Sequence, residues 1–356
     1  MPAPARPGYM NMADWLSEAP KVEVFTGMDR QRFETEIKPR QLPAIMRGAV
    51  DAWPAVAEGR KSPEALCAYL SARANAGKIQ LWTTKPELDG RYSFRDDLQA
   101  PNHMQRSLPF AEIANLLLRD RDGENMPCHY AGGVPVPFIM PGVLAENPAP
   151  FLEPGRPLEI SLWIGNQTRT AAHWDLPQNL ACVVAGRRRF TLFPIDQIGN
   201  LYITPLDLTL AGQPTSLVDF YNPDFEKFPS FRDAMPHAAV ADLEPGDVLY
   251  MPSLWFHHVE SRERFGAMIN FWWRDGPAHV QRTTPLMTLM HALLTLRDMP
   301  EAERLRWRTL FDHYIFAPDG PLDHIPTDAR GMFGPMTPEN EAALRAYLIQ
   351  SLGGKR

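Results

Sequence analysis

The middle of the chain consists of short apolar or alternating segments. Strand patterns cover residues 158–165, 179–185, 188–193, 247–251 and 267–273. Gly186 separates the second and third of these segments, a spacing that predicts a tight hairpin. The turn residues Pro245 and Gly246 precede the fourth segment. Several short strands in succession predict a closed or double-sheet β architecture.

Helical spacing flanks this β region on both sides. Upstream, Ser62 and Pro63 fit the N-cap and the first position of a helix, within a region of mixed helices and strands. Downstream, residues 286–296 carry an apolar stripe at helical spacing, and a second stripe follows over residues 307–315. We expect a loose tail over residues 1–9, one large domain over 10–283 with a barrel core at 155–275, and a helical region over 284–356.

Composition limits the class of protein. The 356 residues are 44% hydrophobic, enough for a large core, and the net charge of −6 gives no general attraction for nucleic acid or anionic lipid. The three cysteines show no CxxC spacing, which indicates reduced thiols in the cytoplasm. The first eight residues lack the apolar core of a signal peptide, and no apolar run reaches the ~18 residues of a membrane span. We therefore expect a cytoplasmic protein without a membrane partner, and a nucleic-acid partner is disfavoured.

His173, Trp174 and Asp175 form the first candidate for a metal site. In a strand, residues i and i+2 point to the same face, so His173 and Asp175 can reach one metal ion. A lone pair of this kind is more often a set of hydrogen-bonded or surface residues than a metal site. The pattern therefore needs a third ligand from elsewhere in the chain.

The best candidates for the third ligand are His257 and His258, which follow the strand at 247–251. Both stand among apolar neighbours, where an unpaired imidazole would be costly. Two histidines and one carboxylate on one face of an octahedron leave three positions open. This is the facial triad of non-haem Fe(II) oxygenases.

The β region resembles the cupin-like, JmjC-related 2-oxoglutarate oxygenases, and within them the asparaginyl hydroxylases. The resemblance rests on the order and spacing of TAAHWD at 170–175, QN at 178–179, LFPIDQ at 192–197, VDFYNPDFE at 218–226, PGDVLYMP at 245–252, WFHHVES at 255–261 and NFW at 270–272. Upstream, LPAIMRG at 42–48 is similar to the entry strand of the family.

The resemblance implies a mainly β fold, a double-stranded β-helix or jelly-roll, with an α/β N-terminal region and a C-terminal helical appendage. It also implies Fe(II) as the metal, with 2-oxoglutarate and O2 as co-substrates. In the family pattern the first histidine of the pair binds iron, so the expected ligands are His173, Asp175 and His257. His258 then faces the other way, because adjacent strand residues alternate.

The resemblance further implies a site for the distal carboxylate of 2-oxoglutarate. The family has a lysine where this chain has Arg188, and an arginine fork can bind a carboxylate with two hydrogen bonds. Alternation places Arg188 on one strand face with Phe190 and Leu192; the alternative is that Arg188 is solvated together with Arg187 and Arg189. Other positions that match co-substrate residues of the family are Thr170, Asn179, Asn270 and, less closely, Tyr130. Trp174 and Trp272 are candidates for the substrate pocket.

The function expected from these features is that of a dioxygenase. It would hydroxylate a C–H group of a peptide side chain or a small molecule and release succinate and CO2. One alternative is a cupin metalloenzyme that does not use 2-oxoglutarate. Such enzymes usually add a glutamate or histidine to the first motif, where this chain has Leu176 and Pro177. The other alternative is a non-catalytic binding protein, against which the intact triad argues.

The C-terminal stripes need a partner surface. Two amphipathic helices must bury their apolar faces against the N-terminal region or against a second subunit. The helices of similar proteins often form a homodimer interface, and the resemblance therefore favours a C2 dimer.

Overall fold

The computed structural model describes residues 12–353 except 124, 318, 319 and 321, so the tail expected over residues 1–9 lies outside it. The chain divides into two compact units, one ending at Trp273 and the other beginning at Arg274. The domain boundaries inferred from the sequence stay predictions. Within the described residues, no helix has the length and apolar character needed to cross a membrane.

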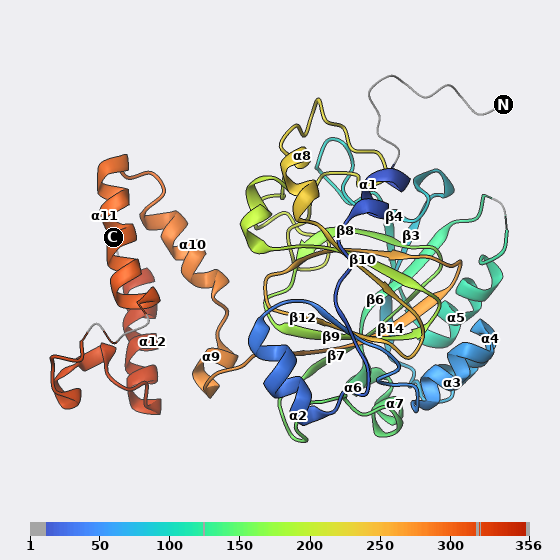
Figure 1. Ribbon diagram of the computed structural model, residues 1–356, viewed down its shortest axis with the longest axis horizontal. Helices are drawn as coiled ribbons and strands as arrows, with labels where there is room; N and C mark the ends of the chain where they lie inside the picture. Colours follow the sequence, from blue (N-terminus) through green and yellow to red (C-terminus); the bar gives the residue numbers. More distant parts are fainter. Residues whose placement is uncertain (1–11, 124, 318–319, 321, 354–356) are drawn as a thin grey trace. The chain divides into compact units, whose positions relative to one another are not determined.

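Two β-sheets form the centre of the first unit (Figure 1). In spatial order, the nine-stranded sheet contains β1 (Val24–Phe25), β2 (Ala44–Met46), β12 (Val248–Met251), β9 (Gln178–Ala185), β14 (Gly266–Trp273), β7 (Glu159–Gly165), β6 (Cys128–Pro135), β3 (Lys78–Thr84) and β5 (Met104–Pro109). The five-stranded sheet contains β11 (Ala239–Leu243), β10 (Arg188–Phe193), β13 (Phe256–Ser261), β8 (Arg169–Trp174) and β4 (Arg91–Tyr92).

Alternation along β9 explains how the sheets pack. Leu180 and Cys182 face a core shared with the helices on the outside of the large sheet. Ala181 and Val183 point the other way, into a core shared with Phe190 of the small sheet. Both faces of β9 are buried, and for this reason the strand reads as a nearly continuous apolar run.

Short helices cover the outer side of the large sheet and the ends of the strands. The helices of the first unit are α1 (Met12–Glu18), α2 (Arg30–Arg32), α3 (Pro54–Lys61), α4 (Pro63–Ser71), α5 (Phe110–Arg119), α6 (Val136–Ile139), α7 (Pro141–Glu146) and α8 (Phe231–Ala234). The predicted start of α4 is confirmed: the hydroxyl of Ser62 accepts a hydrogen bond from the backbone N–H of Ala65 at 3.1 Å, and Pro63 is the first helical residue.

The predicted hairpin around Gly186 is wrong. Strand β9 pairs with β12 and β14, whereas β10 pairs with β11 and β13, so the chain crosses from one sheet to the other at this glycine. Gly186 has φ +65°, and a Cβ there would lie 2.2 Å from the backbone oxygen of Phe265. The glycine therefore serves a close crossing between sheets, a role that a local turn pattern does not separate from a hairpin.

The predicted double-sheet fold with a helical C-terminal region is confirmed. The second unit contains α9 (Ala278–Arg282), α10 (Leu286–Thr295), α11 (Glu301–Phe311) and α12 (Pro338–Leu352). Among the described residues, α10, α11 and α12 bury no side chain, and their exposed apolar residues include Met287, Leu289, Leu294, Trp307, Leu310 and Ile349.

Candidate metal centre and adjoining cavity

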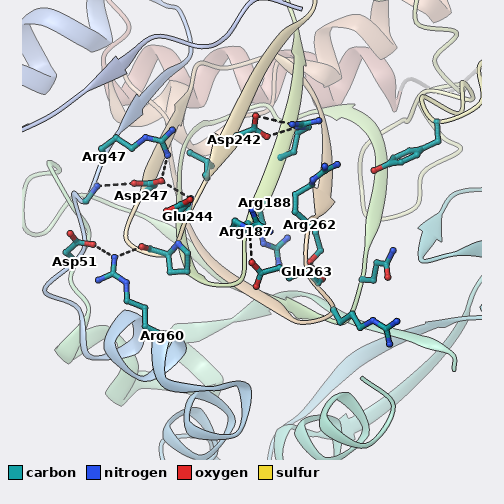
Figure 2. Close-up of a pocket in the computed structure, with 18 residues that line it drawn as sticks. Arg47, Asp51, Arg60, Arg187, Arg188, Asp242, Glu244, Asp247, Arg262 and Glu263 are labelled. Atoms are coloured by element: carbon teal, nitrogen blue, oxygen red, sulfur yellow. Dashed lines mark hydrogen bonds and ion pairs between the residues drawn. The ribbon is translucent and has the colours of Figure 1, made fainter. Parts of the chain in front are cut away.

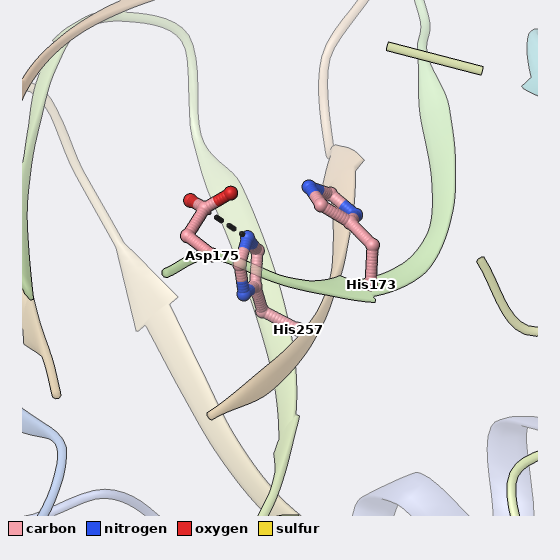
Figure 3. A group of neighbouring side chains, drawn as sticks. All are labelled: His173, Asp175 and His257. Atoms are coloured by element: carbon pink, nitrogen blue, oxygen red, sulfur yellow. Dashed lines mark ion pairs between the residues drawn. The ribbon is translucent and has the colours of Figure 1, made fainter. Parts of the chain in front are cut away.

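The register of two antiparallel strands brings two histidines together. Strand β8 pairs with β13 so that His173 lies directly opposite His257, with the centres of the two imidazole rings 4.3 Å apart. Figure 3 shows Asp175, which follows the end of β8, turned toward the same point. Ligand atoms of these three side chains all lie within 4.8 Å of one another.

Hydrogen bonds orient the carboxylate of Asp175. The indole N–H of Trp272 donates to Asp175 Oδ2 at 3.1 Å, and His257 Nε2 lies 3.6 Å from the same oxygen. The backbone is fixed as well, because the N–H of Leu254 donates to the carbonyl of Asp175 at 2.9 Å. These contacts hold the side chain before any metal binds.

The tautomers of both histidines suit a metal. Nδ1 of His173 lies 2.9 Å from the carbonyl oxygen of Ala171, and Nδ1 of His257 lies 3.0 Å from that of Trp255. Because a carbonyl oxygen only accepts, each Nδ1 carries the proton and each Nε2 presents its lone pair. Burial, with a smaller effect from His173, lowers the pKa of His257 to about 4, so this imidazole is neutral at pH 7.

His258 lies on the other face of β13. It pairs with Thr191 of β10, and its ring lies 5.0 Å from that of Phe220. It is buried and is not part of the cluster of ligand atoms. His257 and His258 therefore lie on opposite faces of β13, as expected from the alternation of side chains along a strand.

A cavity of about 300 Å³ opens beside the three residues. Apart from the two histidines, six aromatic side chains form much of its wall: Trp82, Tyr92, Tyr130, Trp163, Phe190 and Trp272. Its polar lining residues, apart from the candidate metal ligands, are Glu159, Thr170, Asn179, Gln213, Thr215 and Asn270. The cavity therefore joins the candidate metal centre to most of the predicted co-substrate residues.

Arg188 lies behind this cavity and not in its lining. It is 1% exposed, and its Nε and Nη2 atoms have no hydrogen-bond partner among the described residues. Its contact with the cavity runs through Tyr130, whose hydroxyl hydrogen-bonds with Arg188 and Thr170. Burial lowers the pKa of the guanidinium, a sign of how far this charge is removed from water. The alternative that Arg188 is solvated does not hold.

The remaining predicted residues divide between the cavity and the core. The side-chain amide of Asn270 donates to Asn179 Oδ1 at 2.7 Å, while Asn270 Oδ1 is buried without a partner among the described residues. Trp272 lines the cavity. Trp174 pairs with Phe256, is buried and does not line the cavity, so its position does not support a role there.

Sequence reasoning missed part of the cavity wall. Glu159 and Trp163 share one face of β7, and the alternation of that strand could have placed them there. Gln213 and Thr215 lie in the long connection between β10 and β11, which has no periodicity to follow. Their position depends on long-range contacts, such as the hydrogen bond from the N–H of Ser216 to the carbonyl of Ala172 at 2.7 Å.

A larger hollow of about 880 Å³ lies at the turns that join β9 to β10, β11 to β12 and β13 to β14 (Figure 2). Ion pairs occupy much of its surface, including Arg187 with Glu263 at 2.8 Å and Arg60 with Asp51 at 2.5 Å. Exposed pairs of this kind contribute little to stability. Arg188 lines this hollow, but none of the candidate metal ligands does, so we place the metal chemistry in the smaller cavity.

Comparison with known proteins agrees with this architecture. The family model of the cupin-like domain matches residues 30–279. tRNA wybutosine-synthesizing protein 5 of Gallus gallus is 27% identical over 326 residues, which are 81% of this chain and 92% of that protein. Lysine-specific demethylase JMJ31 of Arabidopsis thaliana is 25% identical over 290 residues, 72% of this chain and 51% of that protein. HSPB1-associated protein 1 of Homo sapiens is 37% identical over 134 residues, 37% of this chain and 27% of that protein.

The family model covers more than half of the chain, and its range, residues 30–279, includes nearly all strands of both sheets. The resemblance read from the sequence motifs is confirmed at the level of the family, which supports an oxygenase of the JmjC-related type. The chain belongs to the cupin-like domain family.

Proposed function

We propose that this protein is an Fe(II)- and 2-oxoglutarate-dependent dioxygenase that hydroxylates a C–H group of a peptide side chain or a small molecule, with release of succinate and CO2. The observation that carries the proposal is the cluster of His173, Asp175 and His257 beside a cavity. Two neutral imidazoles and one carboxylate form the ligand set of the facial triad.

The donor set fits a divalent metal ion. Both Nε2 atoms have lone pairs directed away from the backbone, because both Nδ1 atoms are bonded to carbonyl oxygens. Trp272 and the backbone N–H of Leu254 hold Asp175 in place, so little rearrangement is needed for ligation. When bound, Fe(II) with 2-oxoglutarate supplies the activation of O2 for the attack on a C–H bond.

The surroundings of Arg188 fit the distal carboxylate of 2-oxoglutarate. Arg188 has no acidic partner in the part of the chain that the structure describes, and because a buried unpaired guanidinium is unfavourable, an anionic ligand would supply that partner. Tyr130 and Thr170 line the cavity and present hydroxyl groups between it and Arg188. Asn179 and Asn270 are the proposed contacts nearer to the metal.

A second candidate substrate is tRNA. The observation that favours it is the similarity to the chicken tRNA wybutosine-synthesizing protein, which extends over 92% of that protein. The charge of the cavity mouth, described below, argues for the peptide or small-molecule substrate.

The C-terminal helices are the proposed contact of a homodimer. The exposed apolar side chains of α10, α11 and α12 form no core of their own. Surfaces of this kind are usually covered by a partner. The cytoplasm remains the proposed location, on the cysteine pattern alone.

Metal content and succinate formation test the proposal. Anaerobic purification with Fe(II) should give one iron per chain, and the His173→Ala and His257→Ala variants should lose the metal and the production of succinate from 2-oxoglutarate. His258→Ala is the matched control, since this side chain is equally buried but faces the opposite side of the strand. Retention of iron by His257→Ala together with its loss from His258→Ala would contradict the ligand assignment.

A further inference from the structure

The described lining of the cavity carries negative charge and includes neither lysine nor arginine. Glu159 lines the cavity at the first position of β7, is exposed, and makes no hydrogen bond or ion pair with another described residue. The described residues that line the cavity include a second carboxylate, Asp175, but neither lysine nor arginine. Since Asp175 is directed at the metal centre, Glu159 is the acidic group that an incoming substrate would meet.

Two tryptophans stand beside this carboxylate. Glu159 is directly opposite Trp272 in the pairing of β7 with β14, so both side chains lie on the same face of the sheet. Trp163, two positions further along that face, meets Trp272 edge to face with ring centroids 5.8 Å apart. A carboxylate next to the π faces of tryptophans is a favourable environment for an organic cation.

The connection between β10 and β11 adds an acceptor to the cavity. The side-chain oxygen of Gln213 is buried and has no hydrogen-bond partner in the described part of the chain. Its segment is held against β8 by the hydrogen bond from the N–H of Ser216 to the carbonyl of Ala172. Glu159 and Gln213 both line the cavity, so a bound group finds hydrogen-bond acceptors from two separate segments of the chain.

On this basis, and resting on the proposed function, we propose that the site selects a substrate with a cationic, N–H-donating group, an ammonium or a guanidinium, and that Glu159 determines this selectivity. Charge-assisted hydrogen bonds to Glu159 and contact with Trp163 favour the cation. The same carboxylate repels the phosphates of a nucleic acid, which proteins usually bind with lysine and arginine. The geometry therefore favours a basic side chain or a small amine over tRNA.

Binding of matched small probes to the full-length protein tests this assignment. Tryptophan fluorescence of the anaerobic Mn(II)- and 2-oxoglutarate-loaded protein would be titrated with N-acetyl-arginine amide and N-acetyl-lysine amide. The neutral counterparts are N-acetyl-citrulline amide and N-acetyl-norleucine amide. We expect the charged probes to bind the wild type at least about tenfold more tightly than the neutral ones. Glu159→Gln should reduce this preference to about twofold or less.

The control variant is Glu153→Gln, which removes the same charge from an exposed residue that pairs with Arg30 and does not line the cavity. It should keep the full preference. Equal binding of charged and neutral probes to the wild type, absence of binding by any of them, an unchanged preference in Glu159→Gln, or tighter binding of a single-stranded oligonucleotide would each overturn the inference. Succinate formation by the wild type without any probe tests the proposed oxygenase function separately. A failure of that function can therefore be told apart from a failure of the proposed selectivity for cations.

Discussion

Replacement of Arg188 by methionine should stabilise the ligand-free protein and weaken the binding of 2-oxoglutarate. Arg188 is 1% exposed, and two of its nitrogen atoms have no partner among the described residues. Methionine has a similar length without charge or donors, so it removes both unpaired groups and leaves no large void. If Arg188 served only the stability of the fold, the same substitution would instead lower the free energy of unfolding.

The magnitudes follow from the contacts. Each unsatisfied buried donor costs about 1–3 kcal/mol; at about 1.5 kcal/mol for each of the two, less about 1 kcal/mol for the lost hydrogen bond to Tyr130, a net gain of about 2 kcal/mol is expected. For a unit of this size that gain corresponds to a rise in Tm of about 4–8 °C. Loss of two charge-assisted hydrogen bonds to the carboxylate, about 2–4 kcal/mol, weakens binding by about 30- to 900-fold.

Thermal unfolding and calorimetric titration of the anaerobic Mn(II)-loaded protein measure both effects. Added 2-oxoglutarate should raise the Tm of the wild type but not that of Arg188→Met, and Arg188→Lys should be much milder. Arg187→Ala is the control, because Arg187 is exposed and forms an ion pair with Glu263. Arg188→Met with wild-type affinity for 2-oxoglutarate would refute the reasoning, as would equal losses in Arg188→Met and Arg187→Ala.

Two further variants test the dimer and the buried imidazole. Leu293→Glu in α10 should yield monomers in light scattering if the C-terminal helices form the dimer contact; a wild type that is monomeric over a wide concentration range would exclude the dimer. Burial lowers the pKa of His103 to about 4, so the folded state holds this ring neutral and stability should fall as the pH drops from about 6.5 to 4. In urea unfolding, the free energy of unfolding of His103→Gln should fall less than that of the wild type over this pH range, and the difference should be at most about 3 kcal/mol. An equal fall in both proteins would contradict the burial of this ring.

The sequence predicted the parts of the site that depend on strand alternation. The spacing of His173 and Asp175 was enough to place both at one point, and the alternation along β13 separated His257 from His258. The same rule placed Arg188 on the buried face of β10. In each case residues next to one another in the chain determine the answer, although Asp175 itself lies just beyond the end of β8.

The failures involve contacts between distant segments. The turn at Gly186 has the local pattern of a hairpin, and only the partners of β9 and β10 show that it joins two sheets. Gln213 belongs to a long connection whose course is determined by its contact with β8. No period of two or of 3.6 residues carries that information, because it depends on the register of strands far apart in the chain.

Six of the fourteen unpartnered buried polar atoms among the described residues belong to residues at the proposed site. In the described residues they include Nε and Nη2 of Arg188, Asn270 Oδ1, the side-chain oxygens of Gln213 and Thr215, and the indole nitrogen of Trp163. Buried polar groups are usually hydrogen-bonded, and each exception costs about 1–3 kcal/mol. These residues line the cavity or contact its wall, and they are therefore placed where a ligand can complete their hydrogen bonds. A fold that leaves donors and acceptors unpaired at one cavity gains stability when that cavity is filled, which is why ligand-dependent stability is the most direct readout of this site.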